Sequence, residues 1–409
     1  MRAGFLRDEE YAEDGEWGVG SGEWKFLFFF WTVMAQSFEN IIADKLADKQ
    51  KQSLLRSLSL LAGIDFASND YLGLANHFEI AKTAADAYIK HGAGSKGSRL
   101  LSGNNKVFED TEKWLANWKG TEAALIFNCG YSANLGVISA FCDSKTHLFC
   151  DQLSHASILD GYAMSKGKLH RFKHNCHLDL EKALQKTGAD SFKMIVAEAV
   201  YSMDGDVAPL GEYADLAEKY GAMLYVDEAH SDGILGPGGK GLVAQLGIEN
   251  RIHLSLTTFG KAYGTMGACV FGSKLLIDYL INHARSFIYS TAMPPGAVIA
   301  MQKAVEVASR ESFRRESVLK MSENFRKKII EAGFNCLQSE TQIVPVVMGS
   351  IDKAVKCRDF LLENEFNAAC IRPPTVPTGT ARLRINISAA HKEDDVKRLA
   401  ETLIRWNNF

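Results

Sequence analysis

The sequence lacks the features that mark several common protein classes. Proline is scarce, with 8 in 409 residues, and no proline- or serine-rich linker or low-complexity tract divides the chain. The eight cysteines form no C-x-x-C pair, which excludes the usual zinc motif and favours reduced, buried thiols in a cytoplasmic protein over a disulfide framework. No apolar run reaches the roughly 18 residues that a membrane helix needs. The formal net charge of −3 gives no reason to expect nucleic acid as a partner.

Length and patterning indicate a globular chain with at least two domains. Residues 1–33 are rich in glycine, aromatic and acidic residues without helical or strand period, whereas helical spacing begins after Met34. Two interpretations stay open, an upstream extension foreign to the natural protein and a flexible N-terminal arm. The predicted divisions are an extension over 1–33, an N-terminal segment over 34–95, a large α/β domain over 96–300 and a small α+β domain over 301–409.

Short apolar runs alternate with helical segments between about residues 105 and 290. The expected buried strands are 123–127, 193–199, 222–227, 253–258 and 268–272, with a helix over 108–118. This alternation predicts a mostly parallel sheet covered by helices on both faces. After about residue 310 the pattern changes and predicts an α+β unit, with helices over 314–332, 353–363 and 393–406 and strands over 343–347, 369–371 and 382–387.

Two residues at predicted strand ends carry the strongest chemical signal. Lys261 follows a strand in Thr258-Phe259-Gly260-Lys261, and a lysine beside a pocket can lose its proton and form a Schiff base, although most lysines lie in solvent. Asp227 ends another strand, where an acid either caps a helix or holds a protonated pyridine nitrogen. Because ligands of open parallel sheets bind beyond the carboxyl ends of strands, an acid at 227 and a lysine at 261 together predict a pyridoxal site.

Three further segments follow predicted strands, and each also has an ordinary structural interpretation. Gly130 and Tyr131 open a helix whose first N–H groups could hold a phosphate, although many helices begin this way. His155 could stack on a flat cofactor ring or be satisfied by local hydrogen bonds. After the strand over 193–199, Ser202 or Glu198 could face the cofactor, and Asp204-Gly205 in the same segment is also a plain turn signal.

Two arginines lie in the predicted strand over 382–387. Because side chains alternate along a strand, Arg382 and Arg384 point to one face, and Leu383 and Ile385 point to the other. The arginine face is either solvated or directs one guanidinium at a substrate carboxylate, to which it can donate two parallel hydrogen bonds.

These elements, in this order, resemble the α-oxoamine synthases, a family of fold-type I pyridoxal 5′-phosphate (PLP) enzymes. The resemblance runs from about Ile64 to the C-terminus and includes the motifs SNDYLGL (68–74), GSKGSRLLSG (94–103), SMDGD (202–206) and TFGK (258–261). It implies an α/β fold with a mostly parallel central sheet flanked by helices, and a smaller α+β C-terminal domain. It also implies a PLP-dependent acyltransferase that acts as a homodimer with shared active sites.

Segments 288–295 and 371–385 are most similar to the biotin-pathway branch of this family. That branch joins L-alanine to a pimeloyl thioester, of coenzyme A or of a carrier protein, with loss of carbon dioxide. Three alternatives stay open: another α-oxoamine synthase such as glycine C-acetyltransferase, a different pyridoxal reaction such as transamination, and a cofactor-binding scaffold without activity.

The resemblance also implies roles for single residues. Lys261 would be the Schiff-base lysine and general base, Asp227 would pair with the pyridine nitrogen, and His230 with the ring hydroxyl. His155 would stack on the ring and touch substrate. The remaining cofactor contacts would come from Gly130, Tyr131, Ser202, Thr258 and, across a dimer interface, Thr291. Substrate would be bound by Arg384, which would hold the amino-acid carboxylate, and by Thr375 and Arg56.

Two positions depart from the family pattern. Lys96 stands where the glycine-rich loop usually has a small residue, commonly glycine, and it lies near the expected entry route of the thioester. It either favours an anionic acyl carrier or lies in solvent. Phe108 stands where a histidine is common, away from the expected chemistry.

Overall fold

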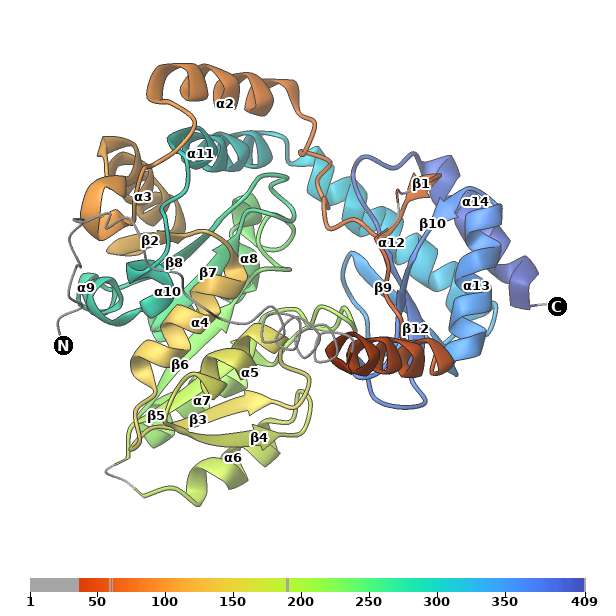
Figure 1. Ribbon diagram of the computed structural model, residues 1–409, viewed down its shortest axis with the longest axis horizontal. Helices are drawn as coiled ribbons and strands as arrows, with labels where there is room; N and C mark the ends of the chain where they lie inside the picture. The colour runs from red at the N-terminus through yellow and green to blue at the C-terminus, as the bar shows by residue number, and fades with distance from the viewer. Residues whose placement is uncertain (1–36, 59, 61, 189–190, 408–409) are drawn as a thin grey trace, which may run out of the picture. The chain divides into compact units, whose positions relative to one another are not determined.

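The computed structural model describes residues 37–58, 60, 62–188 and 191–407 (Figure 1). The predicted extension over 1–33 and Met34 lie outside the described residues. The chain divides into two compact units, Met1–Ser59 and Leu60–Phe409. The described part of the first unit is helical over residues 37–51 and exposes Phe38, Ile41 and Leu46. No helix in the described ranges is both long and apolar enough to cross a membrane. The other domain limits stay predictions.

A seven-stranded sheet forms the centre of the second unit, with strand order β2-β8-β7-β6-β5-β3-β4. Strands β3 to β7 pair in parallel with their neighbours, whereas β8 runs antiparallel to β2 and β7. The mostly parallel sheet predicted from the sequence is therefore confirmed. The strands are β2 (Ala123–Phe127), β3 (His147–Asp151), β4 (Lys168–Phe172), β5 (Lys193–Glu198), β6 (Ala222–Asp227), β7 (Leu254–Thr258) and β8 (Ala268–Gly272).

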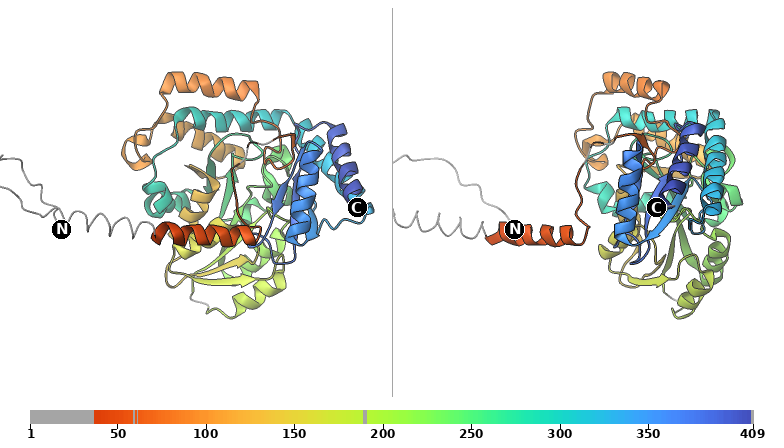
Figure 2. Two further views of the ribbon diagram at one scale, coloured as in Figure 1. Left: turned by 45° about the vertical axis from the view of Figure 1, so that its right-hand side comes forward. Right: turned by 90° about the vertical axis from the view of Figure 1, so that its right-hand side faces the viewer.

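Alternating side chains bury both faces of this sheet. In β5, Met194 and Val196 belong to one apolar cluster and Ile195 and Ala197 to another. The first cluster includes helices α4 (Gly130–Phe141), α5 (Ala156–Ala163), α9 (Lys274–His283) and α10 (Arg285–Ile288). The second includes α6 (His177–Gln185), α7 (Leu210–Tyr220) and α8 (Gly241–Leu246). Because both faces are buried, the central strands are continuous apolar runs, and Figures 1 and 2 show helices on either side.

Three more helices complete the large domain, the part of the second unit built on the seven-stranded sheet. They are α2 (Phe78–His91), α3 (Lys106–Lys119) and α11 (Pro295–Arg310). Helix α3 begins at Asn105, whose side chain accepts from the Val107 N–H at 3.0 Å. It ends at Gly120, which has a φ of 87° that favours glycine. The short turns are η1 (Arg99–Gly103), η2 (Pro237–Gly239) and η3 (Glu249–Arg251).

The C-terminal domain is a three-stranded antiparallel sheet, in the order β11-β12-β9, packed against helices (Figure 2). Leu383 and Ile385 of β12 enter its core, whereas Arg382 and Arg384 lie on the opposite face. Both arginines are buried, with exposed fractions of 3% and 5%, so the solvated-face interpretation is wrong. The elements are α12 (Phe313–Glu331), β9 (Ile343–Gly349), α13 (Ile351–Glu363), β11 (Ala369–Ile371), β12 (Ala381–Asn386) and α14 (Glu393–Asn407), and β1 (Ile64–Asp65) pairs with β10 (Phe366–Asn367).

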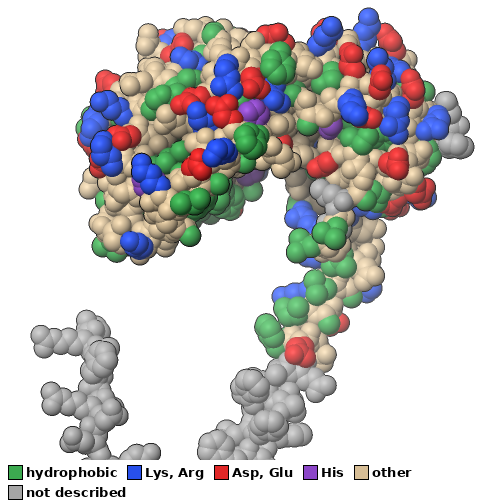
Figure 3. All heavy atoms as spheres, turned by 90° about the horizontal axis from the view of Figure 1, so that it is seen from above, with side chains coloured by type: hydrophobic (Ala, Val, Ile, Leu, Met, Phe, Trp, Pro, Cys, Tyr) green, Lys and Arg blue, Asp and Glu red, His purple; other side chains and the backbone are tan. Residues whose placement is uncertain are grey.

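The structure departs from the sequence expectations in two details. Strands β3 and β4 have no counterpart among the strands expected from apolar runs. Strand β4 is not an apolar run, because it lies at the sheet edge and carries Lys168, His170 and Arg171. All eight cysteines are free, but only five are buried, and Cys129 is exposed at the start of α4. On the face shown in Figure 3, basic and acidic side chains are interspersed.

Candidate active site

The carboxyl ends of the central parallel strands bring several polar side chains together. Glu198 ends β5 and Asp227 ends β6, and the two residues are direct neighbours in the register of the sheet. Thr258 ends β7, and Lys261 follows it in the next turn. Because parallel strands end at one edge, residues far apart in the sequence meet there, as the strand-end pattern predicted.

Lys261 is joined to His230 and Tyr71 by a short chain of polar contacts. Its Nζ lies 2.8 Å from His230 Nε2, and His230 Nδ1 lies 2.7 Å from the Tyr71 hydroxyl. Burial lowers the pKa of Lys261 to about 8. The acidic side chains of Asp227 and Glu198 oppose this shift, and the charge of Arg384 adds to it. Burial also holds the pKa of His230 well below its usual range, so that this imidazole is neutral at physiological pH.

The Asp227 carboxylate is buried and held by fixed donors. Its Oδ2 accepts from Asn134 Nδ2 at 2.8 Å, and its Oδ1 accepts from the Ala229 N–H at 2.9 Å. Asn134 belongs to α4 and is itself oriented by the Tyr225 hydroxyl, which donates to its Oδ1 at 2.7 Å. Contacts with helix α4 and with the turn after strand β6 therefore hold this carboxylate in place.

Glu198 contrasts with its neighbour on the next strand. Burial, and then the charge of Asp227, raise the pKa of Glu198 to about 8, so this side chain is protonated at neutral pH. Its Oε1 accepts from the His155 N–H at 2.6 Å and so holds the start of α5. From the sequence, Glu198 is only one of two residues that could face the cofactor, because its burial and its register beside Asp227 are not visible in the sequence.

The start of α4 lies beside the end of β7. A Cβ atom added to Gly130 would lie 3.5 Å from Thr258 Oγ1, so backbone and side chain nearly touch. The Tyr131 hydroxyl donates to the Asp160 carboxylate. The centre of the Tyr131 ring lies 6.5 Å from the centre of the His155 ring. His155 is exposed in the single chain, and its Nδ1 accepts from the Ser157 N–H at 3.2 Å. Although the residue as a whole is exposed, partial burial of its imidazole ring lowers the pKa of His155.

Arg384 joins the C-terminal domain to this cluster. Its Nε donates to the Ser202 carbonyl, its Nη1 to Asn69 Oδ1 at 3.0 Å, and its Nη2 to the Tyr71 hydroxyl at 3.1 Å. Asn69 and Tyr71 are functional candidates that the sequence reasoning missed. Both residues lie in the motif SNDYLGL (68–74), which resembles that of the family, and this resemblance is the signal that could have assigned them a role.

Two other predicted site residues of the second unit, Thr291 and Thr375, are exposed. Thr291 is exposed, and its carbonyl accepts from Asn128 Nδ2 at 2.9 Å, one residue before the cap of α4. Thr375 is exposed in the turn that follows β11, and its N–H donates to the Arg372 carbonyl. Arg56 belongs to the first compact unit.

The two departures from the family pattern have structural explanations. Lys96 is exposed and has a φ of 67°, a left-handed conformation that favours glycine. Phe108 is buried and lies beneath Arg99, whose guanidinium carbon is 4.0 Å from the centre of the phenyl ring.

These groups fit PLP by their chemistry. A buried carboxylate held by two donors suits a protonated pyridine nitrogen, and a lysine with a depressed pKa suits attachment to an aldehyde. The first N–H groups of the 12-residue helix α4, beside Thr258, suit a phosphate. Asp227, Lys261 and Gly130 would therefore supply three kinds of contact that the cofactor requires.

Comparisons with known proteins agree with this geometry. Residues 62–403 match the family model of the aminotransferases of class I and II. The 8-amino-7-oxononanoate synthase of Citrifermentans bemidjiense is 40% identical over 373 residues, which cover 88% of this chain and 96% of that protein. The solved serine palmitoyltransferase from S. paucimobilis with bound PLP has a TM-score of 0.84 and 29% identity, and covers 91% of this chain and 98% of its own.

A second solved structure, 8-amino-7-oxononanoate synthase from Francisella tularensis, has a TM-score of 0.74 and 26% identity. The match covers 85% of this chain and 98% of that one. Both solved proteins share the fold, and the curated relative is similar over almost its whole length. The chain therefore belongs to the aminotransferase class I and II family of PLP enzymes and, within it, to the α-oxoamine synthases of the 8-amino-7-oxononanoate synthase group.

Proposed function

We propose that this enzyme condenses L-alanine with a pimeloyl thioester, with loss of carbon dioxide, as a cytoplasmic step of biotin biosynthesis. The observation that carries this proposal is the 40% identity to an 8-amino-7-oxononanoate synthase over 88% of the chain. Serine palmitoyltransferase shares the fold of this chain but is only 29% identical to it in sequence. It therefore supports the class of reaction and does not choose the amino acid.

Asp227, Lys261, His230 and His155 would hold the ring of the cofactor. PLP, when bound, supplies an electron-poor ring that accepts the electron pair left at the amino-acid Cα. Asp227 would keep the ring nitrogen protonated, His230 would meet the ring hydroxyl, and His155 would cover one face of the ring. The other proposed cofactor contacts are Gly130, Tyr131, Ser202, Thr258 and Thr291.

Lys261 and Arg384 would act directly on the amino acid. A lysine whose pKa is about 8 has a large neutral fraction near pH 7.5, so Lys261 can take the Cα proton as general base. Arg384 would hold the amino-acid carboxylate by charge-assisted hydrogen bonds and keep it oriented until it leaves. A bond then forms between Cα and the acyl carbon, the C–S bond breaks, and the sulfur departs and takes up a proton as the thiol. The carboxylate is lost as carbon dioxide, and a proton is added at Cα in its place. Thr375 and Arg56 are the remaining proposed substrate contacts.

We also propose that the active sites are shared in a homodimer. Large apolar side chains are exposed in segments that carry predicted site residues or family motifs. They are Leu101 at 83% in the glycine-rich loop, Tyr289 at 72% two residues before Thr291, and Met266 at 56% five residues after Lys261. Exposed apolar groups near a functional site are typical of an interface. Light scattering after size exclusion should give about twice the chain mass of 45.1 kDa, and a mass near 45 kDa would contradict the dimer.

The test of function is thiol release from pimeloyl-CoA by the PLP-loaded enzyme with alanine, glycine or serine. Release with alanine alone supports the proposal, whereas release with glycine or serine alone would keep the family and replace the amino acid. Keto-acid formation without thiol release would indicate transamination, and bound cofactor without any turnover would indicate a scaffold. The Lys261→Ala variant should release no thiol, and normal turnover by it would refute the role of Lys261.

A further inference from the structure

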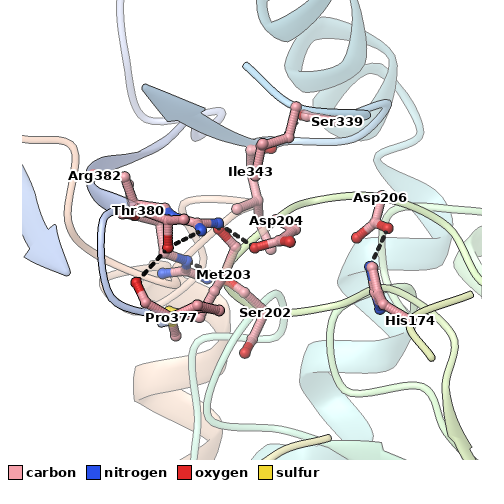
Figure 4. A network of polar contacts seen from close by, with 12 residues as sticks. His174, Ser202, Met203, Asp204, Asp206, Ser339, Ile343, Pro377, Thr380 and Arg382 are labelled. Atoms are coloured by element: carbon pink, nitrogen blue, oxygen red, sulfur yellow. Dashed lines mark hydrogen bonds and ion pairs between the residues drawn. The ribbon is translucent and has the colours of Figure 1, made fainter. Parts of the chain in front are cut away.

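The loop Ser202–Asp206 is held from two sides by different parts of the fold (Figure 4). On the C-terminal side, Arg382 forms an ion pair with Asp204 and donates from Nη1 to the Met203 carbonyl at 3.4 Å. The Gly205 carbonyl accepts from Thr341 Oγ1 at 2.9 Å, in the segment that leads into β9. This side therefore connects the loop to the C-terminal domain.

The other side of the loop is attached to the turn between β4 and α6. His174 Nε2 lies 2.7 Å from Asp206 Oδ2, and His174 Nδ1 lies 3.0 Å from Asp151 Oδ1. Asn175 Nδ2 donates to the same Asp206 oxygen at 2.7 Å. Asp151 is the last residue of β3, so His174 also ties the loop to the segment that leads to His155.

The loop has little freedom to move because it is closely packed. A Cβ atom added to Gly205 would lie 2.0 Å from the carbonyl oxygen of Ile343 on β9. Asp204, Asp206 and Arg382 have exposed fractions of 8%, 6% and 3%. Two buried aspartates therefore lie between a guanidinium on one side and an imidazole on the other, as Figure 4 shows.

The ionisation of His174 fits a cationic role. Burial opposes its protonation, but hydrogen bonds to Asp151 and Asp206 outweigh this effect and raise its pKa to about 10. Burial raises the pKa of Asp204, and the Arg382 guanidinium opposes that rise. Each aspartate thus has its own cationic partner across a short contact.

A metal ion is the competing explanation, because ligand atoms of His174, Asp204 and Asp206 lie within 4.8 Å of one another. Both ring nitrogens of His174, however, are already in contact with carboxylates, and a metal would have to displace a proton that is tightly held. Arg382 also occupies Asp204. These contacts favour a protonated histidine over a metal ligand.

We propose that His174 and Arg382 are positioning residues that clamp the loop Ser202–Asp206 between the two domains and thereby aim the guanidinium of Arg384. Arg384 donates to the Ser202 carbonyl and lies two residues from Arg382 on the same face of β12. A loop that loses either clamp shifts the carbonyl that orients Arg384. The inference rests on the proposed role of Arg384 as the carboxylate-binding residue.

The test compares His174→Gln and Arg382→Lys with a surface control, Arg251→Gln. Arg251 forms ion pairs with Asp215 and Glu218 at the surface, unlike the buried contacts of His174 and Arg382. Amino-acid affinity is read from the spectral change of the PLP-loaded enzyme without any thioester, with alanine, glycine and serine in parallel. Both clamp variants should bind the amino acid about tenfold more weakly at nearly unchanged kcat, because they lose binding that the ground state and the transition state share equally. The control should match the wild type.

Two further measurements separate a clamp from a merely structural role. The double variant should lose less affinity than the product of the single losses, because both residues act through one loop. In the enzyme without cofactor, amide hydrogen exchange at residues 202–206 should be faster in both single variants. If either variant folds poorly, the milder Asp206→Asn replaces it in the exchange measurement.

Several results would overturn the clamp. Wild-type amino-acid affinity in both folded variants would do so, as would unchanged exchange at residues 202–206. One equivalent of divalent metal in the purified wild type that is absent from His174→Gln would establish the metal site instead. If the wild type binds an amino acid but releases no thiol from pimeloyl-CoA, the proposed function fails while the clamp is still judged by affinity and exchange.

Discussion

The depressed pKa of Lys261 predicts how fast the enzyme without cofactor captures PLP at each pH. Only the neutral amine attacks the aldehyde, so the rate follows the neutral fraction of Lys261. Burial lowers this pKa from 10.5 to about 8. At pH 7.5 about a quarter of the lysine is then neutral, against about 0.1% for an ordinary lysine, which makes the predicted gain roughly two-hundredfold.

The perturbation is a pH series from 6 to 10 on the apoenzyme, followed by stopped-flow absorbance after mixing with PLP. The observed rate should rise about tenfold per unit below pH 8 and level off above it. Nα-acetyl-lysine, measured in the same buffers, corrects for titration of PLP itself. Borohydride reduction and peptide mass mapping should place the label on Lys261.

The dependence of the corrected capture rate on pH distinguishes the possible outcomes. A corrected rate that keeps rising to pH 10 would show that burial does not depress the pKa of Lys261. A flat profile would show that another step, such as phosphate docking, limits capture. Labelling at a different lysine would remove Lys261 from the site altogether.

Three further predictions concern stability. The proton on His174 stabilises the fold fully below pH 6.5, and this stabilisation is lost as the pH rises through 10. The difference in unfolding free energy between the wild type and His174→Asn should therefore shrink over that window, from on the order of 4 kcal/mol toward zero. Chemical denaturation at each pH checks this, and a pH-independent difference would contradict it. Lys119→Met should cost about 3–5 kcal/mol, because buried Glu228 and Asp232 lose their shared cation, each at 2.8 Å; a loss below about 1 kcal/mol in urea unfolding would rule this out. Lys96→Gly should gain about 1 kcal/mol by relieving a left-handed backbone and leave the KM for pimeloyl-CoA unchanged, whereas a raised KM would assign the lysine to the acyl carrier.

Local patterning was sufficient to predict the strand ends. Asp227 at the end of one buried strand and Lys261 after another are predictable because apolar runs of five or six residues, broken by turns, indicate a parallel sheet. The sheet edge on which they meet follows from that topology alone. Helix boundaries were predictable to within a few residues where caps such as Asn105 and Gly120 stand at the ends.

The contacts of Arg384 could not be derived from the sequence. The period of a strand puts Arg382 and Arg384 on one face, but it does not say what that face meets. Asn69 and Tyr71 lie more than 300 positions away and reach Arg384 only because the chain folds back on itself. Such pairings depend on packing between domains, which leaves no periodic signal in the sequence.

By itself, then, the sequence determined the class of fold and the cofactor chemistry, and it predicted the lysine proposed to carry the cofactor, because these depend on residue type and local periodicity. Only the tertiary structure decided the charge states. The same side chain types have opposite shifts in pKa according to their surroundings: His230 lies buried beside Lys261 and stays neutral, whereas His174 lies between two aspartates and holds its proton. Charge is set by burial and by partners brought from distant segments, and both arise only when the chain is folded.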